Sequence, residues 1–267
     1  MLGLYFSGTG NSRYALETFL SKQEGVSPCF AIESISNEKK DVIHSIEENE
    51  EIVFSYPVQY SNIPKIVRDF IDSNSSLWKN KRIFVIATMG LFSGDGAGIL
   101  ARRLAKYGAE ITGGLHLKMP DSIADVKALK RSLEENKKLV WEAERKIDRA
   151  VQSMKEGRPP QEGMGLLSHI AGFFGQRLYF YKRTDKYSSQ IVIDKKRCTG
   201  CGKCEKICPM GNLRMMEHSV RAADKCTMCY RCINTCSRQA ITLLGKRVVT
   251  QGTIEKYTIH GGTAWHH

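Results

Sequence analysis

The first 120 residues alternate short apolar runs with amphipathic stretches. Five apolar runs predict β-strands, at Leu2 to Phe6, Cys29 to Ile32, Ile52 to Tyr56, Ile83 to Thr88 and Ile111 to Met119. Between them lie helix patterns at Ser12 to Leu20, Lys39 to Ile46, Pro64 to Ile71 and Gly98 to Tyr107. The first, third and fourth runs are nearly continuous in apolar residues, which is typical of parallel strands covered on both faces. The alternation predicts an α/β fold, a doubly wound five-stranded parallel sheet.

After the fifth strand, apolar residues recur three, four or seven positions apart from Val126 to Met154, on a highly charged background. This spacing predicts one long amphipathic helix. Asp121 or Ser122 is expected to cap it, and Gly157-Arg158-Pro159-Pro160 is expected to end it.

A connector is predicted after this helix, because Gly163 to Lys186 is rich in glycine and then aromatic and basic. Either this segment packs as an arm on one of the two domains or it contacts a membrane surface. We therefore divide the chain into residues 1–156 with the long helix, a connector over residues 157–189, and a second domain with a C-terminal tail over residues 190–267.

The composition of the 267 residues, with 42% apolar and 25% charged side chains, excludes collagen-like, mucin-like and wholly disordered proteins. No uncharged apolar run of roughly 18 residues occurs. The first residues lack the basic flank and cleavage site of a secretory signal. We expect a cytoplasmic protein without a transmembrane segment.

Eight of the nine cysteines form two similar motifs near the C-terminus. The first is Cys198-x2-Cys201-x2-Cys204-x3-Cys208, and the second is Cys226-x2-Cys229-x2-Cys232-x3-Cys236. Three thiolates at this spacing can bind one face of a 4Fe-4S cluster, whereas the fourth ligates the other cluster. We expect Cys198, Cys201, Cys204 and Cys236 to hold one cluster, and Cys226, Cys229, Cys232 and Cys208 to hold the second. Zinc is the alternative, although a third cysteine at the short spacing is more than a zinc hook needs.

The stretch from Ile191 to Leu244 closely resembles the bacterial two-cluster ferredoxins, a small α+β fold. The resemblance implies single-electron transfer. It also implies that Ile207 and Ile233 shield the clusters. Ser237 departs from the pattern, because the second motif usually has proline there.

A candidate phosphate loop lies where the first predicted strand meets the first predicted helix. It consists of Ser7, Gly8, Thr9, Gly10, Asn11 and Ser12. Backbone amides at a helix N-terminus, together with hydroxyl groups, bind a dianionic phosphate without a cationic side chain. The loop lacks the Gly-Lys-Ser/Thr ending of a Walker A motif, and Arg13 replaces the third glycine of the dinucleotide fingerprint.

This loop resembles that of the flavodoxins, and the likeness covers about residues 1–120. Together with the cysteine motifs, it resembles the flavodoxin-ferredoxin fusion family of anaerobic bacteria and archaea. The resemblance implies that FMN binds between the loops that follow the third and fourth strands. The residues implied are Pro57, Val58, Gln59 and Tyr60 in one loop and Thr88, Met89, Gly90 and Phe92 in the other. Tyr60 is the stacking candidate on one ring face and Phe92 or Met89 on the other, and Asp95 is the one acidic residue of the second loop.

Charge is distributed unevenly along the chain. The formal net charge is +12, and residues 190–267 carry 13 Lys and Arg against 5 Asp and Glu. Seven cations lie close to the cysteines, namely Lys195, Lys196, Arg197, Lys203, Lys206, Arg231 and Arg238. An acidic redox partner, a ferredoxin or flavodoxin, is one interpretation, and a soluble surface or contact with nucleic acid or anionic lipid are the others. We predict no nucleic-acid partner.

The sequence therefore predicts an iron-sulfur flavoprotein with FMN and two 4Fe-4S clusters. It would reduce a small molecule or a protein acceptor with ferredoxin-derived electrons. The alternative is a pure electron carrier between protein partners. The cofactors carry this chemistry, so no residue is predicted to be catalytic, and the histidines, including His116 and His169, are expected to be isolated.

Overall fold

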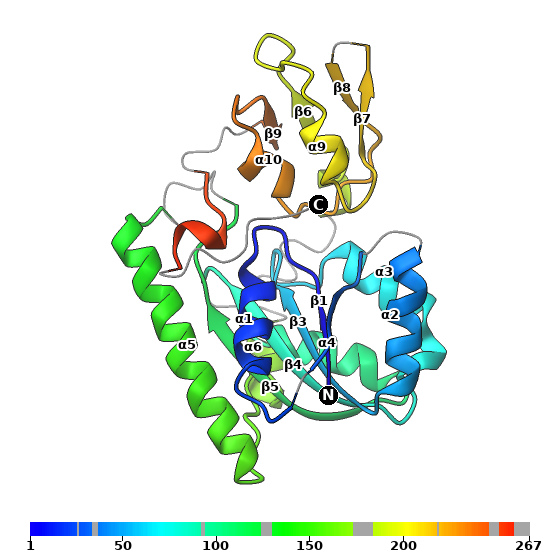
Figure 1. Ribbon diagram of the computed structural model, residues 1–267, viewed down its shortest axis with the longest axis vertical. Coiled ribbons are helices and arrows are strands. Elements are labelled where there is room, and N and C mark those ends of the chain that lie inside the picture. The colour runs from blue at the N-terminus through cyan, green and yellow to red at the C-terminus, as the bar shows by residue number, and fades with distance from the viewer. Residues whose placement is uncertain are drawn as a thin grey trace.

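A computed structural model of the chain describes residues 1–25, 27–33, 37–91, 94–123, 130–172, 184–217, 219–245 and 251–258. The larger part is a sheet flanked by helices on both faces. A smaller domain lies over the edge where the parallel strands end (Figure 1). Among the described residues, no helix is both long and apolar enough to cross a bilayer.

The sheet contains five parallel strands in the order β2-β1-β3-β4-β5. The strands are β1 (Leu2–Tyr5), β2 (Cys29–Ala31), β3 (Glu51–Pro57), β4 (Arg82–Met89) and β5 (Glu110–Lys118). This is the flavodoxin-like order, whose ligand site lies at the carboxyl ends of β1 and β3, where the order reverses. The predicted fold class is confirmed.

Two hydrophobic clusters hold helices against the two faces of the sheet. The helices are α1 (Asn11–Leu20), α2 (Asn37–Glu48), α3 (Lys65–Ser73), α4 (Gly96–Ala105) and α5 (Leu133–Lys155), and a 3-10 turn spans Ser75–Trp78. Leu16 of α1 and Ile147 of α5 belong to one cluster, whereas Ile46 of α2, Val67 of α3 and Leu100 of α4 belong to the other. Both faces of the sheet are therefore covered, as the apolar runs predicted.

Helix α5 begins later than predicted. Its N-terminal cap is Ser132, which accepts a hydrogen bond from the Glu135 amide while the Glu135 side chain accepts one from the Ser132 amide. The predicted caps, Asp121 and Ser122, were wrong because the chain there lines a cleft at the sheet edge. Residues 124–129 lie outside the described part of the chain.

The first half of the predicted connector packs on the sheet domain. The Gly114 amide of β5 donates to the Pro160 carbonyl at 2.8 Å, and the Glu162 amide donates to the Gly114 carbonyl at 2.9 Å. Helix α6 (Leu166–Gly172) follows, and a short helix, α8, spans Thr184–Tyr187. The aromatic and basic residues 173–183 lie outside the described residues.

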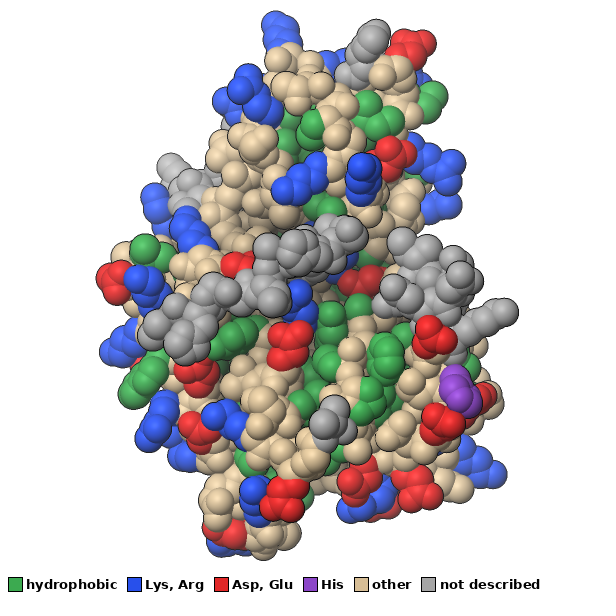
Figure 2. Space-filling model, in the orientation of Figure 1, with side chains coloured by type: hydrophobic (Ala, Val, Ile, Leu, Met, Phe, Trp, Pro, Cys, Tyr) green, Lys and Arg blue, Asp and Glu red, His purple; other side chains and the backbone are tan. Residues whose placement is uncertain are grey.

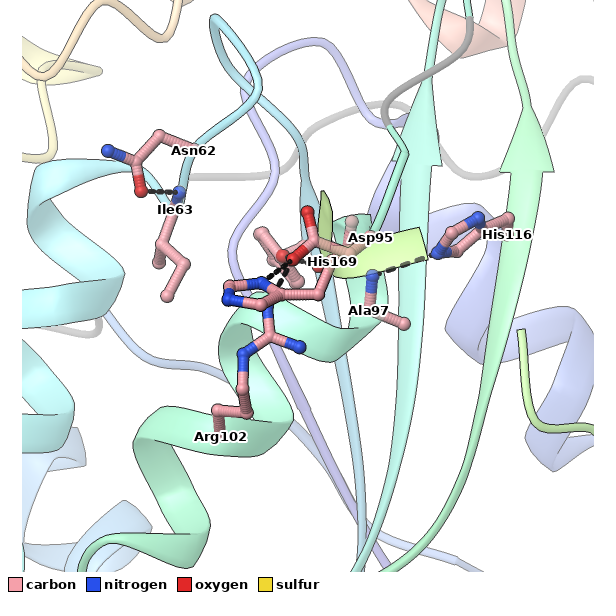
Figure 3. Close-up of polar contacts among 9 residues, drawn as sticks. Asn62, Ile63, Asp95, Ala97, Arg102, His116 and His169 are labelled. Atoms are coloured by element: carbon pink, nitrogen blue, oxygen red, sulfur yellow. Dashed lines mark hydrogen bonds and ion pairs between the residues drawn. The ribbon is translucent and has the colours of Figure 1, made fainter. Parts of the chain in front are cut away.

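Helix α6 is fastened to the start of α4 by a charged group of three residues. The fully buried Asp95 carboxylate is paired with Arg102 of α4 and with His169 of α6, whose Nδ1 lies 2.9 Å away (Figure 3). His116 Nε2 accepts a hydrogen bond from the Ala97 amide at 2.9 Å in the same region. The expectation that His169 and His116 are isolated was therefore wrong.

The smaller domain contains two antiparallel strand pairs and two short helices. The strands are β6 (Ile191–Ile193) with β9 (Ile241–Leu243) and β7 (Leu213–Met216) with β8 (Ser219–Ala222), and the helices are α9 (Lys203–Lys206) and α10 (Arg231–Thr235). Residues 251–258, which include a 3-10 turn at Ile254–Lys256, return to the sheet domain, where Ile254 and Tyr257 join the cluster under α1 and α5.

Candidate functional site

The predicted phosphate loop lies between β1 and α1, with Gly10 at the helix N-cap. Gly10 has a φ of +94°, which favours glycine. The Ser7 hydroxyl is buried and has no hydrogen-bond partner among the described residues. The Ser12 hydroxyl instead lies 2.7 Å from that of Thr88, and Asn11 Nδ2 donates to the Pro120 carbonyl at 2.7 Å. Ser7 is therefore the side chain of this loop with a hydroxyl ready for a phosphate oxygen.

A cleft of about 250 Å³ lies beside the loop at the carboxyl ends of the strands. Except for Gly10, every described residue predicted from the sequence lines it, namely Ser7, Gly8, Thr9, Asn11, Ser12, Pro57, Val58, Gln59, Tyr60, Thr88, Met89 and Gly90. The loop neighbours Ser61 and Leu91 line it as well. Phe92 lies outside the described residues. The volume is just below the roughly 300–1,000 Å³ of typical small-molecule sites.

Two further segments line the cleft that the sequence did not indicate. Residues 120–123 follow β5, and residues Met228 to Tyr230 come from the smaller domain. The first segment follows a predicted strand end, which is a usable signal in an open α/β sheet. The second carries no local signal, because its place depends on how the two domains meet.

The loop after β3 is held from the side of the smaller domain. Gln59 Nε2 donates to the Met228 carbonyl at 3.1 Å, and the hydroxyls of Tyr60 and Tyr230 lie 3.4 Å apart. The Tyr60 ring also packs edge-on against Tyr187, with 5.5 Å between ring centroids. Gln59 Oε1 is buried without a hydrogen-bond partner among the residues that the structure describes, so it is an acceptor at the cleft.

Acidic residues near the cleft are not placed as the sequence suggested. Asp95, the acidic residue of the second loop, is not among the cleft residues and is neutralised by Arg102 and His169. Asp121 does line the cleft. The cleft therefore takes its negative charge from a residue that the sequence had indicated as a helix cap.

The eight clustered cysteines surround two cavities in the smaller domain. One cavity is lined by Cys208, Cys226, Cys229 and Cys232, and the other is lined by Cys198, Cys201, Cys204 and Cys236, with Cys232 also at its edge. These are the two crossed sets expected from the spacing. Among the described residues, no three His, Cys, Asp or Glu side chains lie close enough to bind a single metal ion.

Backbone amides point at the sulfur atoms of both sets. The amide of Asn212 donates to Cys208 Sγ at 3.2 Å, and that of Met228 donates to Cys226 Sγ at 3.2 Å. In the other set, the Ala240 amide donates to Cys236 Sγ at 3.4 Å. Such bonds stabilise a thiolate, and the reduction potential of an iron-sulfur cluster depends on them.

Burial opposes the thiolate form in the protein alone. It raises the pKa of Cys204 to about 11 and that of Cys226 to about 12, and it also raises the pKa values of Cys229 and Cys232. A bound metal centre reverses this preference, because iron deprotonates its thiol ligands. The donor set, its crossed grouping and the amide-to-sulfur bonds fit two iron-sulfur clusters.

The two domains meet between the phosphate loop and Cys229. A β-carbon added at Gly8 would lie 2.1 Å from the Cys229 carbonyl oxygen. Cys229 is buried, and it lines both the second cysteine cavity and the cleft. The second set of cysteines is thus the one beside the cleft.

Arg231 also belongs to this junction. Its guanidinium is almost completely buried, donates to the Ser7 carbonyl at 2.6 Å and pairs with Glu33. Although burial lowers its pKa, the Glu33 carboxylate and the neighbouring Cys229 outweigh that effect and the pKa is raised. The prediction that placed Arg231 among the cations facing a partner was wrong, because the side chain points into the interface.

The first set of cysteines lies on the outer side of the smaller domain. Cys201 is exposed, and the exposed cations Lys203 and Arg238 line the same cavity. Lys195 and Lys196, next to Cys198 in the sequence, are exposed as well. Figure 2 shows Lys and Arg side chains over this domain.

Comparisons with known proteins agree with this interpretation of the smaller domain. Residues 190–237 match the family described as 4Fe-4S dicluster domain. The chain is 35% identical over 57 residues to a ferredoxin of Methanothermococcus thermolithotrophicus, which covers 20% of this chain and 95% of the ferredoxin. It is 45% identical over 60 residues to one component of an ion-translocating oxidoreductase complex of Methanosarcina acetivorans, which covers 22% of this chain but 23% of that component. The chain thus spans less than a quarter of the latter protein.

The larger domain has solved structural neighbours of low sequence identity. A flavodoxin of Megasphaera elsdenii is 19% identical, with a TM-score of 0.39, over 48% of this chain and 95% of the flavodoxin. An archaeal flavodoxin is 13% identical, with a TM-score of 0.39, over 58% and 97%.

The strand order of the larger domain and the ferredoxin match of the smaller domain define an iron-sulfur electron-transfer protein with a flavodoxin-like domain. The chain belongs to the flavodoxin-ferredoxin fusion family, and its C-terminal domain belongs to the 4Fe-4S dicluster ferredoxins.

Proposed function

We propose that this chain binds FMN in the cleft and two 4Fe-4S clusters in the smaller domain, and that it transfers electrons between them. When bound, the clusters exchange single electrons and the flavin accepts one or two. The fusion would thereby convert single electrons into pairs. No side chain is assigned an acid or base role.

The observation that carries the proposal is the position of Cys229. This residue lines a cysteine cavity and the cleft at once, and its carbonyl contacts the phosphate loop at Gly8. A ligand of one cofactor site thus forms a wall of the other. This arrangement supports electron transfer within one chain.

The chain's residues would divide the work of holding FMN. The amides of residues 8–12 and the Ser7 hydroxyl would bind the phosphate, because they gather at the N-terminus of α1. Gln59 and Tyr60 would lie on one side of the ring and Met89 on the other. Cys198, Cys201, Cys204 and Cys236 would hold the outer cluster, and Cys208, Cys226, Cys229 and Cys232 the inner one.

We further propose that an acidic redox protein, such as a small ferredoxin or flavodoxin, docks at the outer cysteines. Lys203 and Arg238 lie at that cavity and are exposed, so opposite charge would speed encounter there. The division into residues 1–156, 157–189 and 190–267 holds as a proposal with one refinement, because residues 251–258 pack on the first unit.

Anaerobic reduction of the purified, cofactor-loaded protein tests the proposed function. We expect a brown protein with FMN absorbance in which a reduced ferredoxin reduces the flavin. Cys226→Ala should abolish this reduction, whereas dithionite should still reduce bound FMN. A colourless protein, or one that takes up no FMN, would overturn the proposal.

Steady-state turnover with a panel of small-molecule acceptors then separates the two roles. An oxidoreductase turns over with at least one small molecule and the electron donor alone. A pure carrier needs a second protein in every reaction.

A further inference from the structure

The C-terminal segment, residues 251–258, joins the outer cysteines to the phosphate loop. It leaves the smaller domain beside α10 and ends under α1 in the larger domain. Nothing in its sequence marks it as part of a site. None of its residues is among those that line the cleft.

One end of the segment is anchored beside the last cysteine. Gln251 Nε2 donates to the carbonyls of Ile233 and Cys236 at 2.8 and 2.7 Å. The Gly252 amide donates to Asn234 Oδ1 at 3.1 Å. Both anchors are on α10 or on the residue that follows it, so this end is fixed to the backbone that presents Cys236.

The other end is fixed to the phosphate loop itself. The Ile254 amide donates to the Thr9 carbonyl at 2.9 Å. The Ile254 side chain is 2% exposed, and its Cγ2 lies 2.3 Å from where a β-carbon on Gly10 would be. Glu255 Oε1 accepts from Arg13 Nη2 at 3.1 Å, which draws that cation toward the segment.

These contacts act on the two features that give the loop its shape. Binding of a phosphate by backbone amides requires the loop to hold one conformation, with Thr9 and Gly10 fixed. The segment fixes Thr9 through its carbonyl and covers Gly10, which has a positive φ. Without the segment, the Thr9 carbonyl and the apolar surface of α1 would be exposed to water.

We propose that residues 251–258 form a clamp that holds the phosphate loop in its binding conformation and couples cofactor affinity to the backbone around Cys236. Ile254 is the positioning residue of this clamp. The inference rests on the proposed function, since it concerns the same phosphate site. Because coupling between sites is reciprocal, binding at the phosphate loop also favours the ordered state of the segment.

FMN and riboflavin titrations of flavin-free, iron-loaded protein test the clamp. Riboflavin lacks the phosphate, so the ratio of its Kd to that of FMN isolates the loop from general destabilisation. We expect Ile254→Ala to weaken FMN binding about tenfold, within the usual range for coupled sites, with riboflavin binding unchanged. Ile254→Val keeps most of the side chain and should restore the FMN affinity.

Ile147→Ala is the matched control, because Ile147 is equally buried in the same hydrophobic cluster but lies on α5. It should lower the thermal midpoint without changing the FMN-to-riboflavin ratio. Equal FMN affinity in Ile254→Ala and the wild type, or equal loss of FMN and riboflavin binding, would overturn the clamp.

If Ile254→Ala does not fold, a chain ending at residue 250 is compared with one ending at residue 258. The longer chain should keep the FMN affinity of the full chain and the shorter one should lose it. Identical affinities would overturn the clamp and leave the proposed function standing. A wild-type protein that binds no FMN would overturn both.

Discussion

The carbonyl oxygen of Cys229 lies so close to Gly8 that no side chain fits between them: a β-carbon at Gly8 would lie 2.1 Å from that oxygen. The close approach of these two residues sets how near the inner cysteine cavity can come to the cleft. Because electron transfer depends on proximity, this contact is the most direct place to perturb it.

Gly8→Ala should push the two domains apart at the cleft. The added methyl group must displace backbone rather than a flexible side chain, so we expect a loss of about 1–3 kcal/mol in the free energy of unfolding, as for overpacking. Flavin reduction by a ferredoxin should become slower while the iron content stays normal. Stopped-flow absorbance measures the rate.

Gly165→Ala is the control for this change, because nothing among the described residues lies within 4 Å of a β-carbon there. Unchanged reduction in Gly8→Ala would mean that the contact does not limit the transfer.

Ser7→Ala tests the phosphate site. The Ser7 hydroxyl is buried without a partner among the described residues, and a hydrogen bond to a charged phosphate is worth about 1.5–3 kcal/mol. We expect FMN affinity to fall about 10- to 100-fold, with riboflavin affinity unchanged, in a fluorescence titration. Ser21→Ala, whose hydroxyl bonds the Thr18 carbonyl on the surface, should have no effect. An effect of equal size on riboflavin would contradict a phosphate contact.

Cys208→Ala tests the crossed ligation. Cys208 belongs to the first sequence motif but lines the cavity of Cys226, Cys229 and Cys232. We expect the electron paramagnetic resonance signal of the inner cluster to change while that of the outer cluster is kept. Cys29→Ala, in β2, should alter neither signal. Loss of the outer signal instead would show that each motif ligates its own cluster.

The docking face is tested with Lys203→Glu combined with Arg238→Glu. Both cations are exposed at the outer cysteine cavity. Reversing them should slow reduction by an acidic ferredoxin, and added salt should slow the wild type in the same way, because charges are screened over about 8 Å at physiological ionic strength.

Dithionite reduction should not respond to these two changes. Lys79→Glu with Lys106→Glu, near the other end of the strands, is the matched control. A rate that is independent of salt would leave the basic charge without a docking role.

His116→Gln tests the acid sensitivity of the larger domain. Burial lowers the pKa of His116 below 6.5, and its Nε2 accepts a hydrogen bond from the Ala97 amide, which requires the neutral ring. A lowered pKa in the folded state means that this contribution to stability is present above pH 6.5 and is lost as the pH falls. The thermal midpoint should therefore drop more between about pH 7.5 and 5.5 in the wild type than in His116→Gln. Equal drops would assign the acid sensitivity to other groups.

The sequence predicted the five strands to within two residues at most of their ends, because buried parallel strands are continuous in apolar residues. The grouping of the cysteines follows from spacing alone. In contrast, the start of α5 was misplaced because Ser132 and Glu135 form a capping box that the apolar periodicity does not reveal. The direction of Arg231 depends on Ser7 and Glu33, which are far away in the chain.

The same reason explains what the sequence left out of the site. Met228 and Tyr230 reach the cleft only because the second domain folds back over the sheet edge. Ile254 meets Thr9 across almost the whole chain. Contacts of this kind have no periodicity and no motif, so a single sequence offers no local pattern for them.

The contact between Thr9 and Ile254 also orders events during synthesis. Thr9 leaves the ribosome 245 residues before its partner does. At about 5–20 residues per second, the phosphate loop waits roughly 12–49 s for the residue that closes on it. All eight clustered cysteines emerge within that interval, so the nascent chain can meet iron and sulfide before its phosphate loop is complete.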